Sequence, residues 1–193
     1  MPIDLTALRV PRPHRGDAAR NFDAVLDAAG HVFAERGFDA PLAEVARRAG
    51  VGIATVYRNF PTREQLVENV YLTEIESVLA EAAAASRLPP WEGLTRFLRR
   101  FVEYLETKRA VAVAIDPESV VYRACREALS EAGRPLLERA QAAGELRADV
   151  DADDIARYVM GAAAVTFASP EQRDRMLGVF FDGLRAQPPR RSR

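Results

Sequence analysis

The chain has 193 residues, of which 48% are hydrophobic and 28% are charged, so it can form a folded core and its composition excludes a disordered protein. No apolar run approaches the roughly 20 residues of a membrane-spanning helix, and the first residues lack the apolar region of a secretory signal. Cys125 is the single cysteine, which excludes an internal disulfide and a zinc site and suggests a cytoplasmic location.

The net charge of −1 does not by itself indicate a nucleic-acid partner, but the charge is unevenly distributed. Two stretches are locally basic, each with one acidic residue, Asp17 in the first and Glu44 in the second. Their arginines are Arg9, Arg12, Arg15 and Arg20 in the first stretch, and Arg47, Arg48, Arg58 and Arg63 in the second. Such patches fit a nucleic-acid surface, although solvated surface is the commoner explanation.

The two ends of the chain are predicted to lack a packed structure. Residues 1–19 combine prolines and a glycine with charges, and we expect a flexible basic arm. Residues 187–193, with the sequence QPPRRSR, are expected to form a disordered tail. Almost everything between them has helical periodicity, which predicts an all-α fold of about nine helices.

The first four helices are separated by clear stop and start signals. One helix is expected to begin near Phe22 and to end near Gly37, which suits the residue after a helix. Two short helices follow over 42–49 and 53–60, with Pro41 before the first and Gly50 after it. Thr62 is placed to cap a fourth helix that runs past residue 85.

Five further helices are predicted in the second half of the chain. They cover about 91–105, 117–132, 135–143, 153–167 and 170–184, and an apolar stretch lies at 110–115. Gly133 and Pro135 are expected to interrupt the chain between the second and third of these helices. The expected caps are Asp116 for the second helix, Asp151 or Asp153 for the fourth and Ser169 for the last.

Residues 42–60 have the pattern of a helix-turn-helix. Two short helices that cross steeply need a small residue where they approach and a residue of positive φ in the turn. Ala46 and Gly50 meet these two needs, while Val45, Ala49, Val51 and Val56 fall at inward positions. The remaining positions of the second short helix would then face outward, as in a helix that enters the DNA major groove.

The predicted DNA-binding residues divide by their chemistry. Thr55, Tyr57 and Arg63 suit phosphate contacts, which set register on the duplex rather than sequence choice. Ile53 and Ala54 suit thymine methyl groups, and Arg58 could bind guanine or a phosphate. The complete predicted set is Arg47, Gly52, Ile53, Ala54, Thr55, Tyr57, Arg58, Asn59 and Arg63. A helical hairpin that packs but binds nothing is the alternative for this segment.

The segment from 21 to 66 resembles the DNA-binding domain of TetR-family regulators. The resemblance is carried by Ala28-Ala29, Phe33, Glu35-Arg36-Gly37, Val45-Ala46, Ala49-Gly50-Val51, Thr55-Val56-Tyr57, Phe60, Arg63 and Leu66. It implies a DNA-binding domain over 20–66 and a helical effector-binding and dimerisation domain over 67–186. It also implies an obligate homodimer on a roughly palindromic operator, most often a repressor that a small-molecule effector releases and sometimes an activator.

Two positions depart from the family pattern. The family usually has Thr or Ser where Pro41 stands, so a helix cap and a phosphate contact are in doubt. It often has Ser where Gly52 stands, so a second hydroxyl is missing. These departures could weaken DNA binding or transfer its burden to other residues.

The last two helices are expected to form the dimer interface. The predicted interface residues are Tyr158, Gly161, Ala162, Val165, Phe180, Phe181 and Leu184, with an ordinary core of the chain itself as the alternative. An effector pocket is expected among the middle helices, and its few charges indicate a largely apolar ligand. Its candidate residues are Phe97, Phe101, Tyr104, Val113, Tyr122, Cys125, Met160 and Phe167, although aromatics at helical spacing are more often plain core.

Two other classes of function compete with a DNA-binding regulator. An enzyme would need a poised constellation, but the chain has only His14 and His31, no glycine-rich phosphate loop and no metal-ligand cluster. We therefore expect no catalytic residue, no metal and no cofactor. The second competitor is a protein-interaction module that keeps the helix-turn-helix shape without binding DNA, and Pro41 is part of its support.

Overall fold

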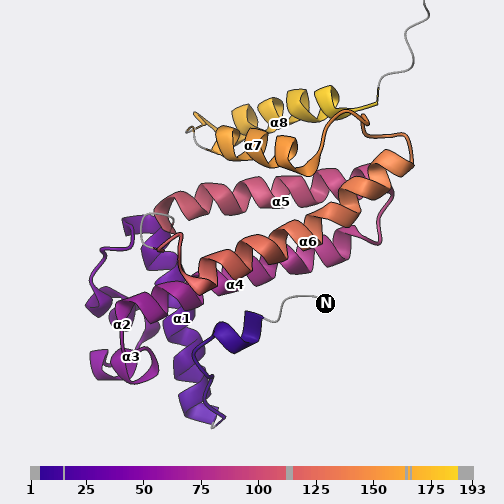
Figure 1. Ribbon diagram of the computed structural model, residues 1–193. Helices are drawn as coiled ribbons and strands as arrows, with labels where there is room; N and C mark the ends of the chain where they lie inside the picture. Colours follow the sequence, from indigo (N-terminus) through magenta and orange to yellow (C-terminus); the bar gives the residue numbers. More distant parts are fainter. Residues whose placement is uncertain (1–4, 15, 112–114, 164, 166, 187–193) are drawn as a thin grey trace, which may run out of the picture. The chain divides into compact units, whose positions relative to one another are not determined.

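The computed structural model describes residues 5–14, 16–111, 115–163, 165 and 167–186, with backbone alone at 107–111 and 163 (Figure 1). These ranges contain eight α-helices, one short 3₁₀ helix and no strand, which confirms the all-α prediction. None of the helices in these ranges has the combined length and apolar character that a bilayer crossing requires. Val113, Arg15 and the tail over 187–193 lie outside the described residues.

The chain forms two compact units. The first holds residues up to 76 together with 107–127, and the second holds 77–106 together with the residues from 128 onward. The first boundary between the units falls between residues 76 and 77, inside α4 (Arg63–Ala85). Each helix that contributes to both units is described below by the part that lies in each.

The first unit contains the 3₁₀ helix η1 (Leu5–Leu8), α1 (Gly16–Arg36), α2 (Leu42–Ala49), α3 (Ile53–Asn59) and the first part of α4. Helices α1, α2 and α3 pack against one another (Figure 1). The ring centroids of Phe22 and Phe60 lie 4.8 Å apart, and those of Phe33 and Phe38 lie 4.9 Å apart. The first pair joins α1 to the end of α3, and the second joins α1 to the loop before α2.

The second unit contains most of α5 (Pro90–Val111), the later part of α6 (Val120–Ala142), α7 (Ala152–Ala163) and α8 (Pro170–Leu184). Helices α7 and α8 lie side by side (Figure 1), and the rings of Tyr158 and Phe180 stack between them at 3.9 Å. The end of α8 is joined to the chain before α7 by an isolated β-bridge between Leu146 and Arg185. The amide of Trp91, in the first turn of α5, donates to Glu145 Oε2 at 2.7 Å.

Several predicted helix ends are confirmed. Gly37 and Gly50 have φ of 79° and 67°, the left-handed region that glycine adopts without strain. Thr62 Oγ1 accepts from the amide of Gln65, and Ser169 Oγ accepts from the amide of Gln172. Of the two candidate caps for α7, Asp151 is the one that acts, because its Oδ1 accepts from the amide of Asp154 at 2.9 Å.

The predicted interruption at Gly133 and Pro135 is wrong, because α6 runs unbroken through both. A Cβ on Gly133 would lie 2.9 Å from the ring of Phe97, so this glycine allows a close approach to α5 rather than a break. Pro135 removes one helical hydrogen bond, but the buried residues Leu136 and Leu137 hold the following turn in the core.

The starts of two helices also differ from the prediction. Helix α6 begins at Val120, and its cap is Ser119 rather than Asp116, because Ser119 Oγ accepts from the amide of Tyr122. Asp116 Oδ1 instead accepts from the amide of Glu118, within the preceding turn. Helix α1 begins at Gly16, several residues before Phe22. Residues 16–19, which were predicted to belong to a flexible arm, are therefore helical.

Candidate nucleic-acid interface

The turn between α2 and α3 is built as the sequence predicts. Gly50 takes a left-handed conformation and its amide donates to carbonyls of the last turn of α2, and the amide of Val51 donates to the carbonyl of Ala46 at 3.0 Å. Val45 and Val56 are fully buried and Ala46 is 4% exposed. This inward face fixes α3 with its other side in solvent.

The exposed side of α3 carries most of the predicted DNA-binding residues. Ile53 is 42% exposed and Tyr57 is 51% exposed, which is unusual for side chains of their size. Gly52 precedes the helix in an extended conformation and supplies no side-chain cap. Ala54 and Arg58 are exposed as well. This side therefore offers apolar, phenolic and guanidinium groups to a ligand.

Two predicted residues of α3 are partly engaged within the helix. Thr55 Oγ1 accepts a hydrogen bond of 3.0 Å from Arg58 Nη2, and the Thr55 carbonyl accepts one of 3.0 Å from Asn59 Nδ2. Thr55 and Asn59 are half-buried, so they are less available than Ile53 and Tyr57. The bond to Thr55 also holds the Arg58 side chain along the helix surface.

Arg63 has a structural contact that the sequence did not indicate. Its Nη1 donates to the carbonyl oxygen of Phe38 and, at 2.9 Å, to that of Ala40. The guanidinium at the start of α4 thus holds the loop between α1 and α2. A phosphate contact by Arg63, predicted from the sequence, would have to use its remaining N–H groups.

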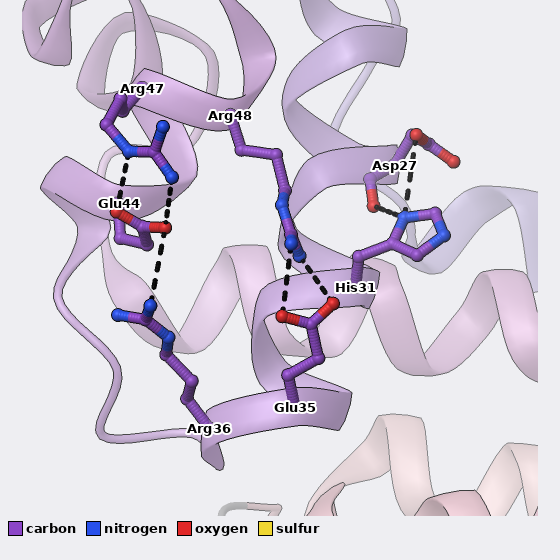
Figure 2. A network of polar contacts seen from close by, with 7 residues as sticks. All are labelled: Asp27, His31, Glu35, Arg36, Glu44, Arg47 and Arg48. Carbon is purple, nitrogen blue, oxygen red and sulfur yellow. Dashed lines mark hydrogen bonds and ion pairs between the residues drawn. The ribbon is translucent and has the colours of Figure 1, made fainter.

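Figure 2 shows a network of ion pairs between α1 and α2. Arg47 binds both oxygens of Glu44 at 2.7 and 2.9 Å, and Arg36 lies 3.8 Å from the same carboxylate. Arg48 binds both oxygens of Glu35 at 2.8 and 3.0 Å. The second basic stretch is therefore less positive than a count along the sequence indicates, because Glu35 lies outside that stretch.

These pairs shift the ionisation of their members. The hydrogen bond from Arg47 is the main cause that lowers the pKa of Glu44 to about 2, against a smaller opposing effect of burial. The hydrogen bond from Arg48 likewise lowers the pKa of Glu35. A carboxyl whose pKa is lower in the folded state stabilises the fold above its unfolded pKa. The contribution of Glu44 is therefore complete above pH 4.5 and is lost as the pH falls toward about 2.

Replacing Glu44 with glutamine is expected to raise the affinity for DNA about threefold, irrespective of sequence. The variant removes a negative charge and releases Arg47 from a bidentate pair, so one more cation is available to phosphate. Fluorescence anisotropy across a salt series should show a slope that is steeper by about 0.9. Glu81→Gln is the matched control, because Glu81 pairs with Arg96 in the second unit. A lower affinity would instead show that the Glu44–Arg47 pair orders the interface.

Comparison with known proteins agrees with this geometry. A family model described as bacterial regulatory proteins of the tetR family matches residues 25–70. A second, described as the C-terminal domain of SbtR-like transcriptional regulators, matches residues 89–186. A TetR transcriptional regulator from Streptomyces coelicolor is 36% identical, with a TM-score of 0.72, over 86% of this chain and 99% of that one. The chain belongs to the TetR family of transcriptional regulators.

Other solved structures extend the comparison. A TetR regulatory protein from Mycobacterium vanbaalenii is 34% identical, with a TM-score of 0.70, over 90% of this chain and 99% of that one. A ketosteroid transcriptional regulator of Mycobacterium tuberculosis has a TM-score of 0.63 at 18% identity, over 93% of this chain and 100% of that one, which shows the shared fold alone. The TetR fold therefore spans both units of the chain.

The candidate effector residues of this TetR-family chain fall into separate groups. Phe97, Phe101 and Tyr104 follow one another along α5, with ring centroids 6.1 and 6.0 Å apart. In the first unit, the ring of Tyr122 stacks on that of Tyr71 at 6.5 Å, and Cys125 is fully buried. Phe97, Tyr104 and Cys125 are buried, whereas Phe101 and Tyr122 are half-buried.

The remaining candidate effector residues are less enclosed. Met160 is 51% exposed, so within one chain it lies at the surface and not in a pocket. Phe167 is half-buried, and Val113 lies outside the described residues. The groove between α7 and α8, of about 320 Å³, is lined by none of the predicted effector residues.

The predicted dimer residues divide into two sets. Tyr158, Gly161 and Val165 are exposed and Ala162 is half-buried, as an interface requires. Phe180, Phe181 and Leu184 are instead at most 8% exposed within one chain, which favours the alternative of an ordinary core for these three residues. Phe180 stacks on Tyr158, and the guanidinium of Arg99 lies over the ring of Phe181.

Two exposed apolar residues of α8 were not predicted, and each directly precedes a buried residue, Leu177 or Phe180. Met176 is 48% exposed and Val179 is 67% exposed. Tyr158 and Met160 of α7 and Val165 just after it are exposed as well, and we refer to these five exposed apolar residues together as the α7–α8 face. Met176 and Val179 are three positions apart on α8, and this spacing could have indicated a shared side of the helix. The prediction instead favours the adjacent stripe, because its phenylalanines are larger.

Proposed function

We propose that this TetR-family regulator is a repressor that binds a palindromic operator as a homodimer and leaves it when a small-molecule effector binds. The exposed side of α3 carries the proposal, because Ile53 and Tyr57, four positions apart, lie exposed together on one side of the helix. Side chains of this kind suit thymine methyl groups and phosphates in a major groove. The same proposal includes no enzymatic activity and a cytoplasmic location.

The α7–α8 face supports the homodimer. An exposed apolar surface on a soluble chain marks an interaction site, and a second copy of the same face satisfies it symmetrically. Two-fold symmetry would then present two α3 helices to half-sites about 34–36 Å apart. A largely apolar effector is proposed from the aromatic row on α5, where Phe101 keeps part of its surface exposed.

Fluorescence anisotropy with the intergenic DNA upstream of the protein's own gene tests the proposal. We expect tight binding of two protomers, or a multiple of two, at each site. The logarithm of the affinity should fall linearly with the logarithm of the salt concentration, because phosphate contacts release counterions. Transcription from the same DNA in vitro separates a repressor from an activator of the same fold. Repression that an effector relieves supports the proposal, and stimulation contradicts it.

A protein-interaction module is the second candidate function. The ion pairs of Arg47 and Arg48 favour it, because they reduce the positive charge that a DNA surface needs. Weak association with DNA that does not change with salt would support this function. Failure to select any genomic fragment would support it as well and would overturn the regulator.

Replacing Pro41 with threonine is expected to strengthen both folding and DNA binding. Pro41 precedes α2 with an extended ψ of 132° and makes no side-chain cap, so the amides of the first turn lack that partner. A threonine hydroxyl would accept from one of them, which stabilises a protein by about 1 kcal/mol, and could donate to a phosphate. Thermal denaturation and operator titration check the two effects. Pro41→Ala is the control that changes the backbone without adding a hydroxyl, and equal behaviour of the two variants would contradict the cap.

A further inference from the structure

The N-terminal segment, predicted from the sequence to be a flexible arm, is bound to α4. Arg9 Nε and Nη2 donate to the two carboxylate oxygens of Glu76 at 2.9 and 2.7 Å. The two terminal nitrogens of the same guanidinium donate to Thr73 Oγ1 at 3.1 and 3.2 Å. The Arg9 side chain is only 19% exposed. This arginine is therefore committed to the protein and is not free for DNA.

A buried amide continues the attachment. The backbone N–H of Val10 donates to Asn69 Oδ1 at 3.1 Å, and Asn69 Nδ2 donates to the carbonyl of Gln65 at 2.7 Å. Asn69 is 1% exposed, and the segment supplies the hydrogen-bond donor for its buried Oδ1. Leu5, in η1, is 4% exposed and anchors the segment by burying apolar surface.

The other end of the segment is bound to α1. Arg12 Nε and Nη2 donate to the two oxygens of Asp23 at 2.7 and 2.6 Å. The hydrogen bond raises the pKa of Arg12 and lowers that of Asp23. The segment over 5–14 thus connects the outer surface of α1 with that of α4, and we call it the N-terminal strap.

The N-terminal strap also lies close to the end of α3, the helix that we propose enters the DNA major groove. A groove of about 430 Å³ separates the two, with Asn69 also among its lining residues. Arg58 and Asn59 of α3, and Pro61 after it, line the groove together with Val10 and Pro11 of the strap. A shift of the strap would therefore change the surroundings of the last turn of α3.

We propose that the N-terminal strap positions the helix-turn-helix by holding α1 to α4, and that Arg9 and Arg12 bind protein carboxylates and not DNA phosphates. The proposal rests on the DNA-binding function proposed above. It assigns Arg9, Arg12 and Asn69 as positioning residues for DNA binding. For residues 5–14, it replaces the expectation of a flexible basic arm.

A charge-exchange experiment separates positioning from DNA contact. If the strap positions α4, Arg9→Gln and Glu76→Gln remove the same ion pair, and each should lower operator affinity about fivefold at an unchanged salt slope. The double variant Arg9→Glu/Glu76→Arg should restore most of the lost affinity. If Arg9 contacts a phosphate, Arg9→Gln alone should lose operator affinity, and its affinity should depend less steeply on salt, by about 0.9 in the log–log slope. In that case Glu76→Gln should bind the operator more tightly than the wild type. That second pattern would overturn the proposal.

Two controls keep the result interpretable. Arg134→Gln removes an exposed arginine from the second unit and should leave operator affinity unchanged. Amide hydrogen exchange at Val10, measured without DNA, reports on the strap alone. Slow exchange in the wild type that becomes fast in Asn69→Ala supports the strap, and fast exchange in the wild type overturns it. Absence of DNA binding by a wild type with a protected Val10 amide would instead overturn the proposed function, and with it the positioning role.

Discussion

The variant Val179→Asp is expected to be a monomer at micromolar concentration and to bind the operator at least 100-fold more weakly than the wild type. Val179 is 67% exposed, so the substitution costs little within one chain. In a dimer through the α7–α8 face, the carboxylate would be buried without a partner, which strongly opposes association. Two linked half-site contacts bind far more tightly than one, typically by a factor of about 10² to 10⁴.

Light scattering after size exclusion measures the mass of the Val179 variant, and anisotropy measures its DNA binding. Val120→Asp is the matched control, because Val120 is 62% exposed and lies in the first unit, at the start of α6. It should remain dimeric with ordinary affinity. If Val179→Asp were dimeric and Val120→Asp monomeric, the dimer would form through a different surface.

The variant Arg63→Ala should lose both stability and DNA binding. Its guanidinium bonds the carbonyls of Phe38 and Ala40, and hydrogen bonds from a charged group contribute about 2 kcal/mol. We expect the free energy of unfolding to fall by about that amount, and affinity to fall on every DNA sequence alike.

Tyr57→Phe should weaken operator binding without changing stability, because Tyr57 is 51% exposed.

Urea denaturation and anisotropy on two unrelated DNA sequences distinguish the roles of Arg63. If the affinity of Arg63→Ala depends less steeply on salt than that of the wild type, by about 0.9 in the log–log slope, the phosphate contact predicted from the sequence is established. Loss of stability at an unchanged slope would assign Arg63 to the loop between α1 and α2 alone. Full stability in Arg63→Ala would contradict the structural role.

The helix-turn-helix was predictable because its signals are local. Gly37 and Gly50 end their helices in the left-handed conformation that their positions suggest, and Thr62 and Ser169 cap the helices that they precede. A turn and a cap involve residues within five positions of each other, so a short stretch of sequence contains all the partners. The same reason explains why the exposed side of α3 was correctly identified.

Two of the charge pairs could not be predicted because their partners are distant in sequence. Arg9 and Glu76 are 67 positions apart, and Arg48 and Glu35 are 13 apart on different helices. A count of charges along the chain therefore overstates how basic the DNA-binding unit is. The attachment of residues 5–14 could not be predicted either, because its partners on α1 and α4 are distant in sequence. In addition, prolines and charges are typical of free arms and of docked segments alike.

Two errors in the second unit come from packing. In the sequence, Gly133 indicates a helix break, because glycine weakens a helix. Its actual role, a close contact with the ring of Phe97, is visible only in the fold. On α8 the apolar residues occupy two adjacent stripes, and periodicity does not indicate which of them faces the core. The structure buries Phe180 and exposes Val179, which moves the expected dimer contact by about 100° around the helix.

The burial of Cys125 has a practical consequence. It is the only cysteine in the chain and its side chain is fully buried, so the native protein presents no accessible thiol. A single substitution such as Ala34→Cys, at an exposed position of α1, would therefore be labelled alone. In a homodimer each protomer would carry one spin label. The distance between the two labels would report whether an added small molecule changes the separation of the two helix-turn-helix units.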